Sequence, residues 1–301
     1  MEAWIPITIA AAFLQNTRSA LQKHLKGDLT NLGAAYVRFL YAWPFALIYV
    51  AGLHGWGGMA LPQFNGVFLA YCVAGGLAQI IFTVLLMWLF SFRNFAVGTT
   101  YSKTEIVQIA ILGFLILGDT LTVLAGAAIV VAVLGVILLS MGQTGTGFKT
   151  LLSGLSEKPT VIGLVCGAFL GASVVLYRGA ALSLAYDGAV MAAAYTLAVS
   201  VVIQAVVMGV YIGVRERRTL IDVLVHWRWS LAVGVSGALA SMAWFTAFTL
   251  QNAAYVRALG QIELVFTFMA SVFFFRERTG RVEVAGIVLV VTGIVILILT
   301  R

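Results

Sequence analysis

The sequence from Leu121 to Met141 is LTVLAGAAIVVAVLGVILLSM, and it contains no charged residue. A helix of this length rises about 30 Å, which is the thickness of the hydrocarbon core of a bilayer. A second stretch, RVEVAGIVLVVTGIVILIL from Arg281 to Leu299, has the same aliphatic character after its first three residues. Both stretches predict membrane-spanning helices.

The whole chain has the composition of a protein whose solvent is mostly lipid. Of its 301 residues, 62% are hydrophobic and only 10% are charged, whereas soluble domains carry about 25% charged residues. Its mean hydropathy is +1.05. Because so few charges cannot cover a water-exposed surface, we expect an all-α integral membrane protein that crosses the cell membrane several times.

Division of the apolar runs at glycine, proline, asparagine and charge clusters predicts ten transmembrane helices. The predicted spans are 4–25, 32–53, 65–90, 96–117, 121–141, 160–182, 188–213, 229–251, 254–275 and 281–299. The stretch 142–159 contains several glycine, serine and threonine residues and predicts a linker. It divides the chain into a first half, 1–141, and a second half, 160–301, with five spans each.

The two halves resemble each other when the first is shifted by 158 residues. The shift superposes Asn94 on Asn252, Ala96 on Ala254, Glu105 on Glu263, Asp119 on Glu277, and Gly135 on Gly293. A repeat with an odd number of spans must insert its second copy upside down. The sequence therefore predicts two inverted five-helix repeats, an architecture of secondary transporters whose substrate site lies at the repeat interface near the midplane.

The segments before the last span of each half resemble a known transporter motif. They are Leu117-Gly118-Asp119-Thr120-Leu121-Thr122 and Phe275-Arg276-Glu277-Arg278-Thr279, each followed by a glycine-containing span. In these features the chain is similar to the drug/metabolite transporter superfamily, specifically its ten-helix EamA-type members. The first copy departs from that family's Gly-Glu-Arg-like turn at Asp119-Thr120. The resemblance implies transport of small solutes such as amino acids, nucleosides or sugars.

Ionisable residues inside the predicted spans indicate where a solute binds. There are five cations and two carboxylates: Arg18, Arg38, Lys103, Arg178, Arg257, Glu105 and Glu263. Each costs at least ~2.5–3.5 kcal/mol to insert and usually faces a bundle interior or a cavity. The excess positive charge favours a solute with a carboxylate or another anionic group. The alternative, interhelical ion pairs that only hold the bundle together, stays open for each residue.

We predict a substrate-binding set from these ionisable residues and from polar side chains near midplane depth. The set is Gln15, Asn16, Arg18, Arg38, Gln79, Tyr101, Glu105, Gln108, Gln261 and Glu263. The spacing of Tyr101, Glu105 and Gln108 places them on one face of a continuous helix. A single Gln or Asn in a span can equally serve as a helix-to-helix hydrogen bond.

The predicted function is secondary transport, as an exporter, of a small polar metabolite such as an amino acid or an organic anion, by alternating access. A lipid or lipid-carrier flippase of the same fold is the alternative. An intramembrane enzyme is disfavoured, because the sequence contains no His-Glu-x-x-His metal motif, no Gly-x-Ser-x-Gly elbow and no P-loop. A channel is a third alternative, and a conductance recording would distinguish it from a transporter.

The expected partners are a small-molecule substrate and the lipid bilayer. We predict no cofactor and no metal, because Cys72 and Cys166 lie in apolar runs and the three histidines lie in or beside loops. The net charge of +7 does not form a nucleic-acid-binding stripe, so no nucleic acid is expected. No obligatory protein partner is evident.

The basic residues predict the orientation of the chain. The odd-numbered connections carry Lys23, Lys26, Arg93, Lys149, Lys158, Arg215, Arg217, Arg218, Arg228, Arg276, Arg278 and Arg281, whereas the other side carries only Arg301. Lysine and arginine concentrate on the cytoplasmic side. We therefore predict that both termini lie outside. A reporter fused to the C-terminus should be accessible from outside intact cells, and a cytoplasmic reporter would overturn this orientation.

Overall fold

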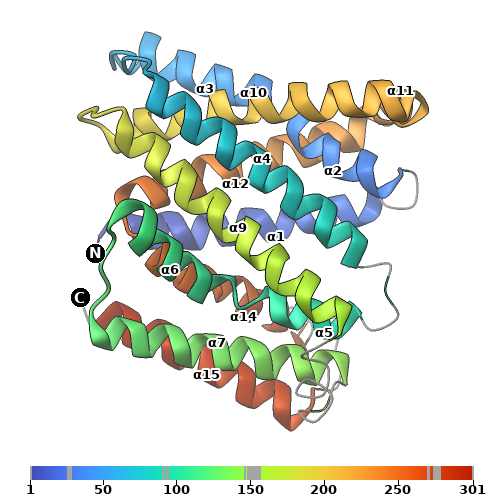
Figure 1. Cartoon of the computed structure of the whole chain (residues 1–301), viewed down its shortest axis with the longest axis vertical. Helices are drawn as coiled ribbons and strands as arrows, with labels where there is room; N and C mark the ends of the chain where they lie inside the picture. Colours follow the sequence, from blue (N-terminus) through green and yellow to red (C-terminus); the bar gives the residue numbers. More distant parts are fainter. Residues whose placement is uncertain are drawn as a thin grey trace. The chain divides into compact units, whose positions relative to one another are not determined.

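A computed structural model describes residues 2–25, 29–89, 92, 95–145, 147, 157–269, 272–273 and 279–299, and regular structure in these ranges is helical throughout (Figure 1). Several residues used in the sequence predictions lie outside the described residues: Lys26, Arg93, Asn94, Lys149, Phe275, Arg276, Glu277, Arg278 and Arg301. The second copy of the turn motif, up to Arg278, is among them.

Within the described residues, seven helices belong to the first half of the chain and seven to the second half. In the first half they are α1 (Trp4–Leu25), α2 (Asn31–Leu40), α3 (Trp43–Gly55), α4 (Gly66–Leu89), α5 (Phe95–Ser102), α6 (Glu105–Leu117) and α7 (Val123–Thr144). In the second half they are α9 (Lys158–Ser183), α10 (Ala189–Arg215), α11 (Arg217–Val225), α12 (Trp227–Leu250), α13 (Ala253–Gly260), α14 (Ile262–Met269) and α15 (Arg281–Leu299).

Within the described residues the structure confirms the all-helical fold, which is consistent with a membrane protein, but it does not confirm ten spans. By length and composition, eight helical stretches within the described ranges can cross a membrane: 32–55, 66–86, 100–117, 123–143, 158–183, 189–215, 227–250 and 281–299. The predicted spans 4–25 and 254–275 are not among them. The first carries Arg18 and Lys23, which lower its hydropathy, and the second is divided into the two short helices α13 and α14.

Three of the predicted spans are broken helices. The interruptions fall at Tyr41–Ala42 between α2 and α3, at Lys103–Thr104 between α5 and α6, and at Gln261 between α13 and α14. Pro44 explains the first, because proline has no N–H to continue the hydrogen-bond ladder but is accommodated in the first turn of α3. The prediction of one continuous helix through Tyr101, Glu105 and Gln108 is therefore wrong, since α5 ends at Ser102.

The helix starts agree with a repeat of 158 residues. Asn31 and Ala189 begin α2 and α10, Phe95 and Ala253 begin α5 and α13, and Val123 and Arg281 begin α7 and α15, each pair 158 residues apart. Both α5 and α13 are eight residues long. These coincidences support the internal repeat. Its inversion and the boundaries 1–141, 142–159 and 160–301 stay predictions.

The turn after α6 shows why the first copy of the turn motif contains a glycine. Gly118 has a φ of 68°, a left-handed conformation that glycine adopts without steric cost. Its N–H bonds to the carbonyl oxygens of Gly113 and Phe114, so that the last carbonyls of α6 are satisfied. Thr122 then caps α7, because its hydroxyl accepts from the Ala125 N–H at 3.2 Å.

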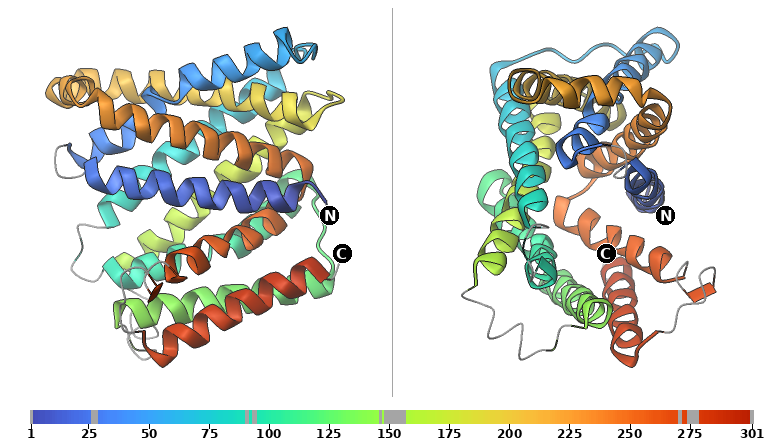
Figure 2. Two further views of the ribbon diagram at one scale, coloured as in Figure 1. Left: turned by 180° about the vertical axis from the view of Figure 1, so that it is seen from behind. Right: turned by 90° about the vertical axis from the view of Figure 1, so that its right-hand side faces the viewer.

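The chain forms two compact units that do not follow the two sequence halves. Unit 1 comprises Met1–Ile80 and Leu176–Gln251, and unit 2 comprises Ile81–Val175 and Asn252–Arg301. Helices α4 and α9 each contribute one part to each unit. Within unit 1, α1 packs along α12, and the side chains of α2 pack against α10 and α12. Within unit 2, α7 and α15 lie side by side (Figure 2).

Glycines bring α7 and α15 into backbone contact. A Cβ atom on Gly135 would lie 2.5 Å from the Val290 nitrogen, and one on Gly286 would lie 2.5 Å from the Leu139 nitrogen. A Cβ atom on Gly293 would lie 2.7 Å from the Ala132 nitrogen. Small residues allow helices to approach closely in lipid, where van der Waals packing rather than the hydrophobic effect drives association.

Gly135→Ala should therefore destabilise unit 2 by about 1–3 kcal/mol, the usual cost of overpacking, and lower the midpoint of thermal unfolding in detergent. Gly126→Ala is the matched control on the same helix, because its added methyl group would have no neighbour within 4 Å. Equal unfolding midpoints for the two variants would contradict this packing of α7 on α15.

Candidate functional site

The break between α2 and α3 positions Arg38 in unit 1. Thr30 caps α2, because its hydroxyl accepts from the Gly33 N–H at 3.1 Å. The helix ends at Tyr41, whose N–H donates to the Val37 carbonyl at 3.1 Å. The Tyr41 hydroxyl donates to the Val223 carbonyl at 3.1 Å, which attaches the break to α11. Arg38 thus lies in the last turn of a short helix that is held at both ends.

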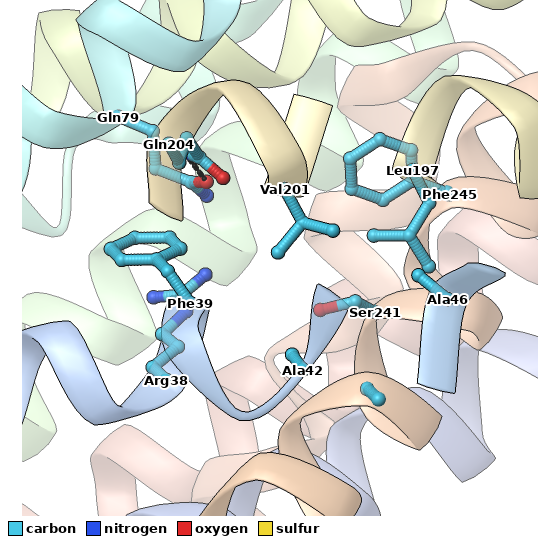
Figure 3. A pocket seen from close by; sticks show the side chains of 11 residues that line it. Arg38, Phe39, Ala42, Ala46, Gln79, Leu197, Val201, Gln204, Ser241 and Phe245 are labelled. Carbon is cyan, nitrogen blue, oxygen red and sulfur yellow. Dashed lines mark hydrogen bonds between the residues drawn. The ribbon is translucent and has the colours of Figure 1, made fainter. Parts of the chain in front are cut away.

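Arg38 lines a small cavity with ten other residues of unit 1 (Figure 3). They are Phe39, Ala42, Ala46, Gln79, Leu197, Val201, Gln204, Ala238, Ser241 and Phe245. The volume open to the centre of a water-sized sphere is about 20 Å³, which is room for about one water molecule. Helices α2, α3, α4, α10 and α12 all contribute to the walls, so side chains far apart in the sequence meet here.

Two amides and a phenol form a hydrogen-bond network at this cavity. The Gln79 Oε1 atom accepts from the Gln204 Nε2 atom at 2.6 Å and from the Tyr177 hydroxyl at 3.3 Å. These bonds connect α4 to α10 and to α9. Figure 3 shows Arg38 extending toward Gln79 and Gln204 beside the Phe39 ring, and its guanidinium carbon lies 5.3 Å from the centre of that ring.

The charge of Arg38 has no carboxylate neighbour among the described residues, since no oxygen of Asp or Glu lies within 4 Å of its nitrogens there. The Ser241 hydroxyl in the same cavity makes no hydrogen bond to the described part of the chain. A guanidinium inside a membrane protein is costly without an anionic partner. The cavity therefore presents a positive charge and a hydroxyl that makes no hydrogen bond to the described residues, and both are groups that complement an anion.

The charge of Arg178 is stabilised by backbone carbonyl oxygens. Its Nη1 atom donates to the carbonyl oxygens of Phe248 and Gln251, both at 2.6 Å. These are among the last carbonyls of α12, which have no partner within the helix, and a cation at a helix C-terminus is stabilised by the helix dipole. Arg178 is thus a structural cap for α12.

The predicted cluster on α1 contacts α12. Gln15 accepts at its Oε1 atom from the Trp244 indole N–H at 3.0 Å. The Arg18 stem packs on Gly237, where an added Cβ atom would lie 3.2 Å from the Arg18 Cδ atom. Neither Gln15, Asn16 nor Arg18 lines the Arg38 cavity. The geometry of Gln15 is that of a helix-to-helix hydrogen bond, the alternative considered for a single Gln in a span.

A second polar cluster lies in unit 2 at two helix breaks. Glu105, in the first turn of α6, forms a buried ion pair with Arg257 of α13. Arg257 also interacts electrostatically with Glu263 in the first turn of α14. The Nε2 atom of Gln108 donates to the Leu164 carbonyl at 3.3 Å. The Oε1 atoms of Gln108 and Gln261 are buried and accept no hydrogen bond from the described residues.

The structure thus assigns the predicted residues to separate groups. Arg38 and Gln79 share the cavity of unit 1, while Glu105, Gln108, Gln261 and Glu263 lie around the breaks of unit 2. Tyr101 lies on α5, the helix before the break. The predicted set lacked Gln204, Tyr177 and Ser241. Gln204 was recognisable as a polar residue within an apolar run, whereas a Tyr or Ser in a span gives no such signal.

Comparison with known proteins agrees with a transporter fold. The EamA-like transporter family matches residues 158–299, and it is a family of transporters rather than enzymes. A solved structure described as "Crystal structure of protein" is similar with a TM-score of 0.72 and 15% identity, over 100% of this chain and 99% of that one. At this identity, the similarity shows a shared fold alone. No curated protein matches the sequence.

Removal of one partner from the Glu105–Arg257 pair should destabilise the fold strongly. Glu105→Gln leaves a buried guanidinium without its carboxylate, and loss of one partner of a buried pair costs about 3–5 kcal/mol. Arg257→Gln in the Glu105→Gln background should restore only part of the loss, because both charges of the pair are then gone but Glu263 loses its electrostatic interaction with Arg257. Thermal unfolding of the two single variants and the double variant measures the coupling energy, and additive effects would contradict a buried pair.

Proposed function

We propose that this chain is a member of the drug/metabolite transporter superfamily, which the match of residues 158–299 to the EamA-like transporter family supports. We further propose that it is a secondary transporter of a small carboxylate-bearing metabolite such as an amino acid or an organic anion. Arg38 supplies the counter-charge for the carboxylate. Gln79, Gln204 and Ser241 supply the neutral polar contacts that orient the rest of the solute.

The observation that carries this proposal is the charge of Arg38. Among the described residues it has no carboxylate within 4 Å, although Gln79 and Gln204 at the same cavity are fixed by their mutual hydrogen bond. Because the two amide side chains are already held in place, they lose little further conformational entropy when a solute binds. A planar guanidinium matches a carboxylate with two parallel hydrogen bonds. The polar groups are therefore arranged in advance for an anionic group.

The size of the cavity supports a mechanism in which the site opens and closes. Space for about one water molecule is too small for an amino acid, so the helices around Arg38 must separate for a solute to enter. The break at Tyr41–Ala42 lies three residues from Arg38 and provides a hinge, because helix termini absorb backbone rotations readily. We infer alternating access by opposite motions of two inverted repeats, with net export as the direction.

The same fold serves the alternative, a lipid or lipid-carrier flippase. Its ligand would require a polar site that opens onto a long apolar surface. The Arg38 cavity instead gathers a guanidinium, two amides and a hydroxyl, and it holds about one water molecule rather than a long apolar surface. Its apolar lining residues are Phe39, Ala42, Ala46, Leu197, Val201, Ala238 and Phe245. This chemistry favours a compact, water-soluble anion over a lipid.

Arg38→Gln should weaken binding and transport of carboxylate solutes by about 10- to 100-fold, because a hydrogen bond to a charged group contributes about 1.5–3 kcal/mol. Arg38→Lys should retain part of the affinity, since it keeps the charge but loses the two-point geometry. A thermal-shift screen of the pure protein against amino acids, nucleosides, sugars and organic acids identifies the solute. Uptake of that solute into proteoliposomes then measures transport.

Ile129→Ala is the control for this experiment. Ile129 is a buried aliphatic side chain of α7, so its truncation tests whether any buried substitution impairs transport at similar expression. We expect transport by Ile129→Ala to exceed transport by Arg38→Gln at least tenfold. The proposal fails if Arg38→Gln transports the solute as well as the wild type does, or if only cationic solutes stabilise the protein.

A further inference from the structure

An apolar groove lies outside the Arg38 cavity. It runs between the α2–α3 helix pair and α10 in unit 1, and its volume is about 600 Å³, within the range of ligand sites in proteins. Trp43 lies on the wall formed by α2 and α3, Val206 and Val210 lie on α10, and Leu220 of α11 also lines the groove. Val206 and Val210 are 58% and 62% exposed, so the α10 wall of the groove is open to the outside of the protein.

Two lining residues of this largely apolar groove carry a polar group, the Tyr36 hydroxyl and the Trp43 indole N–H. Tyr36 is only 4% exposed, and its hydroxyl makes no hydrogen bond to the described residues. Gly209 gives this hydroxyl access to α10, because a Cβ atom there would lie 2.5 Å from the Tyr36 oxygen. A phenol in a largely apolar groove suits a ligand that has a long hydrocarbon part and at least one hydrogen-bond acceptor.

Arginines follow the groove at the end of α10. Arg215 is in the last turn of α10, and Arg217 and Arg218 begin α11. All three are exposed, and within the described ranges none has a carboxylate oxygen within 4 Å. Arg217 instead donates from its Nε atom to the Gly213 carbonyl at 3.4 Å. Arg215 and Arg218 are thus available to an anion from outside the protein.

The spacing along α10 matches the depth of one leaflet. At 1.5 Å per residue, the groove from Val202 to Val210 extends about 12 Å, and Arg215 lies about 7 Å beyond it. One leaflet contributes about 15 Å of hydrocarbon. A chain in the groove therefore lies at acyl depth when the arginines lie at headgroup depth, where each adds about 1 kcal/mol of attraction to anionic lipid.

We propose that this groove is a binding site for an anionic phospholipid. One acyl chain lies along Val202–Val210 against Trp43, the Tyr36 hydroxyl donates a hydrogen bond to an ester carbonyl, and the phosphate lies between Arg215 and Arg218. Because α2 and α3 form one wall of the groove, the bound lipid braces the broken helix that carries Arg38. The lipid therefore stabilises unit 1, independently of which solute the protein transports.

Native mass spectrometry of the purified protein, supplied with phosphatidylglycerol or phosphatidylcholine in mixed micelles, tests the site. We expect the wild type to retain phosphatidylglycerol at least tenfold better than phosphatidylcholine and to unfold at a higher temperature with phosphatidylglycerol. Val206→Trp, which fills the groove, should reduce retention tenfold. Val207→Trp is the matched control, because Val207 is exposed on the same helix but does not line the groove.

Arg215→Gln combined with Arg218→Gln tests the headgroup contact separately. Both side chains are exposed, so this variant should fold even if Val206→Trp does not. It should retain the two lipids equally, without preference for phosphatidylglycerol. Equal phosphatidylglycerol retention by Val206→Trp and Val207→Trp would overturn the groove site. A preference for phosphatidylglycerol that survives loss of both arginines would overturn the headgroup site.

Discussion

A positive charge inside a membrane protein must be stabilised by nearby oxygen atoms, and this constraint explains much of the structure. Arg257 is met by the carboxylate of Glu105, and Arg178 is met by the last carbonyls of α12. Arg38 is different: within the described residues it faces a cavity with amides, an aromatic ring and a hydroxyl, but no carboxylate. Arg38 has neither a carboxylate partner nor a hydrogen bond to a helix-end carbonyl within the described residues, and it is therefore the arginine for which we propose an external anion.

The helix breaks also place polar groups inside the protein, where they must be shielded from lipid. A broken helix exposes N–H and C=O groups that an intact helix would use internally, and in lipid such groups are tolerated only where protein or a cavity surrounds them. Arg38 lies in the turn before one break, Glu105 begins the helix after the second, and Gln261 is the third. The polar residues of the spans therefore gather where the backbone is also polar, whereas the uninterrupted α7 and α15 pack through glycines and aliphatic side chains.

Part of the candidate site was predictable from residue type and depth alone. Arg38, Gln79, Glu105 and Gln261 stood out because polar residues in apolar runs are rare. Their partners did not stand out: Tyr177 and Ser241 are common in spans, and the hydrogen bond of Gln79 to Gln204 joins residues 125 positions apart. The breaks were also missed: Lys103–Thr104 lies in the polar stretch Thr99–Glu105 and Gln261 follows Gly260, but each stretch has apolar residues on both sides and was assigned to one continuous span.

The sequence by itself determined that the chain is helical and crosses a membrane, because hydrophobic length and composition decide partition into lipid regardless of tertiary contacts. It also contained the repeat, which the helix starts 158 residues apart support. Only the tertiary structure decided which buried charges are paired. Arg38, Arg178 and Arg257 look alike in sequence, but distant helices bring a carboxylate to Arg257, helix-end carbonyls to Arg178, and amides and a hydroxyl into the cavity of Arg38. Whether an intramembrane arginine binds a solute, caps a helix or holds the fold together is therefore a property of its neighbours in space.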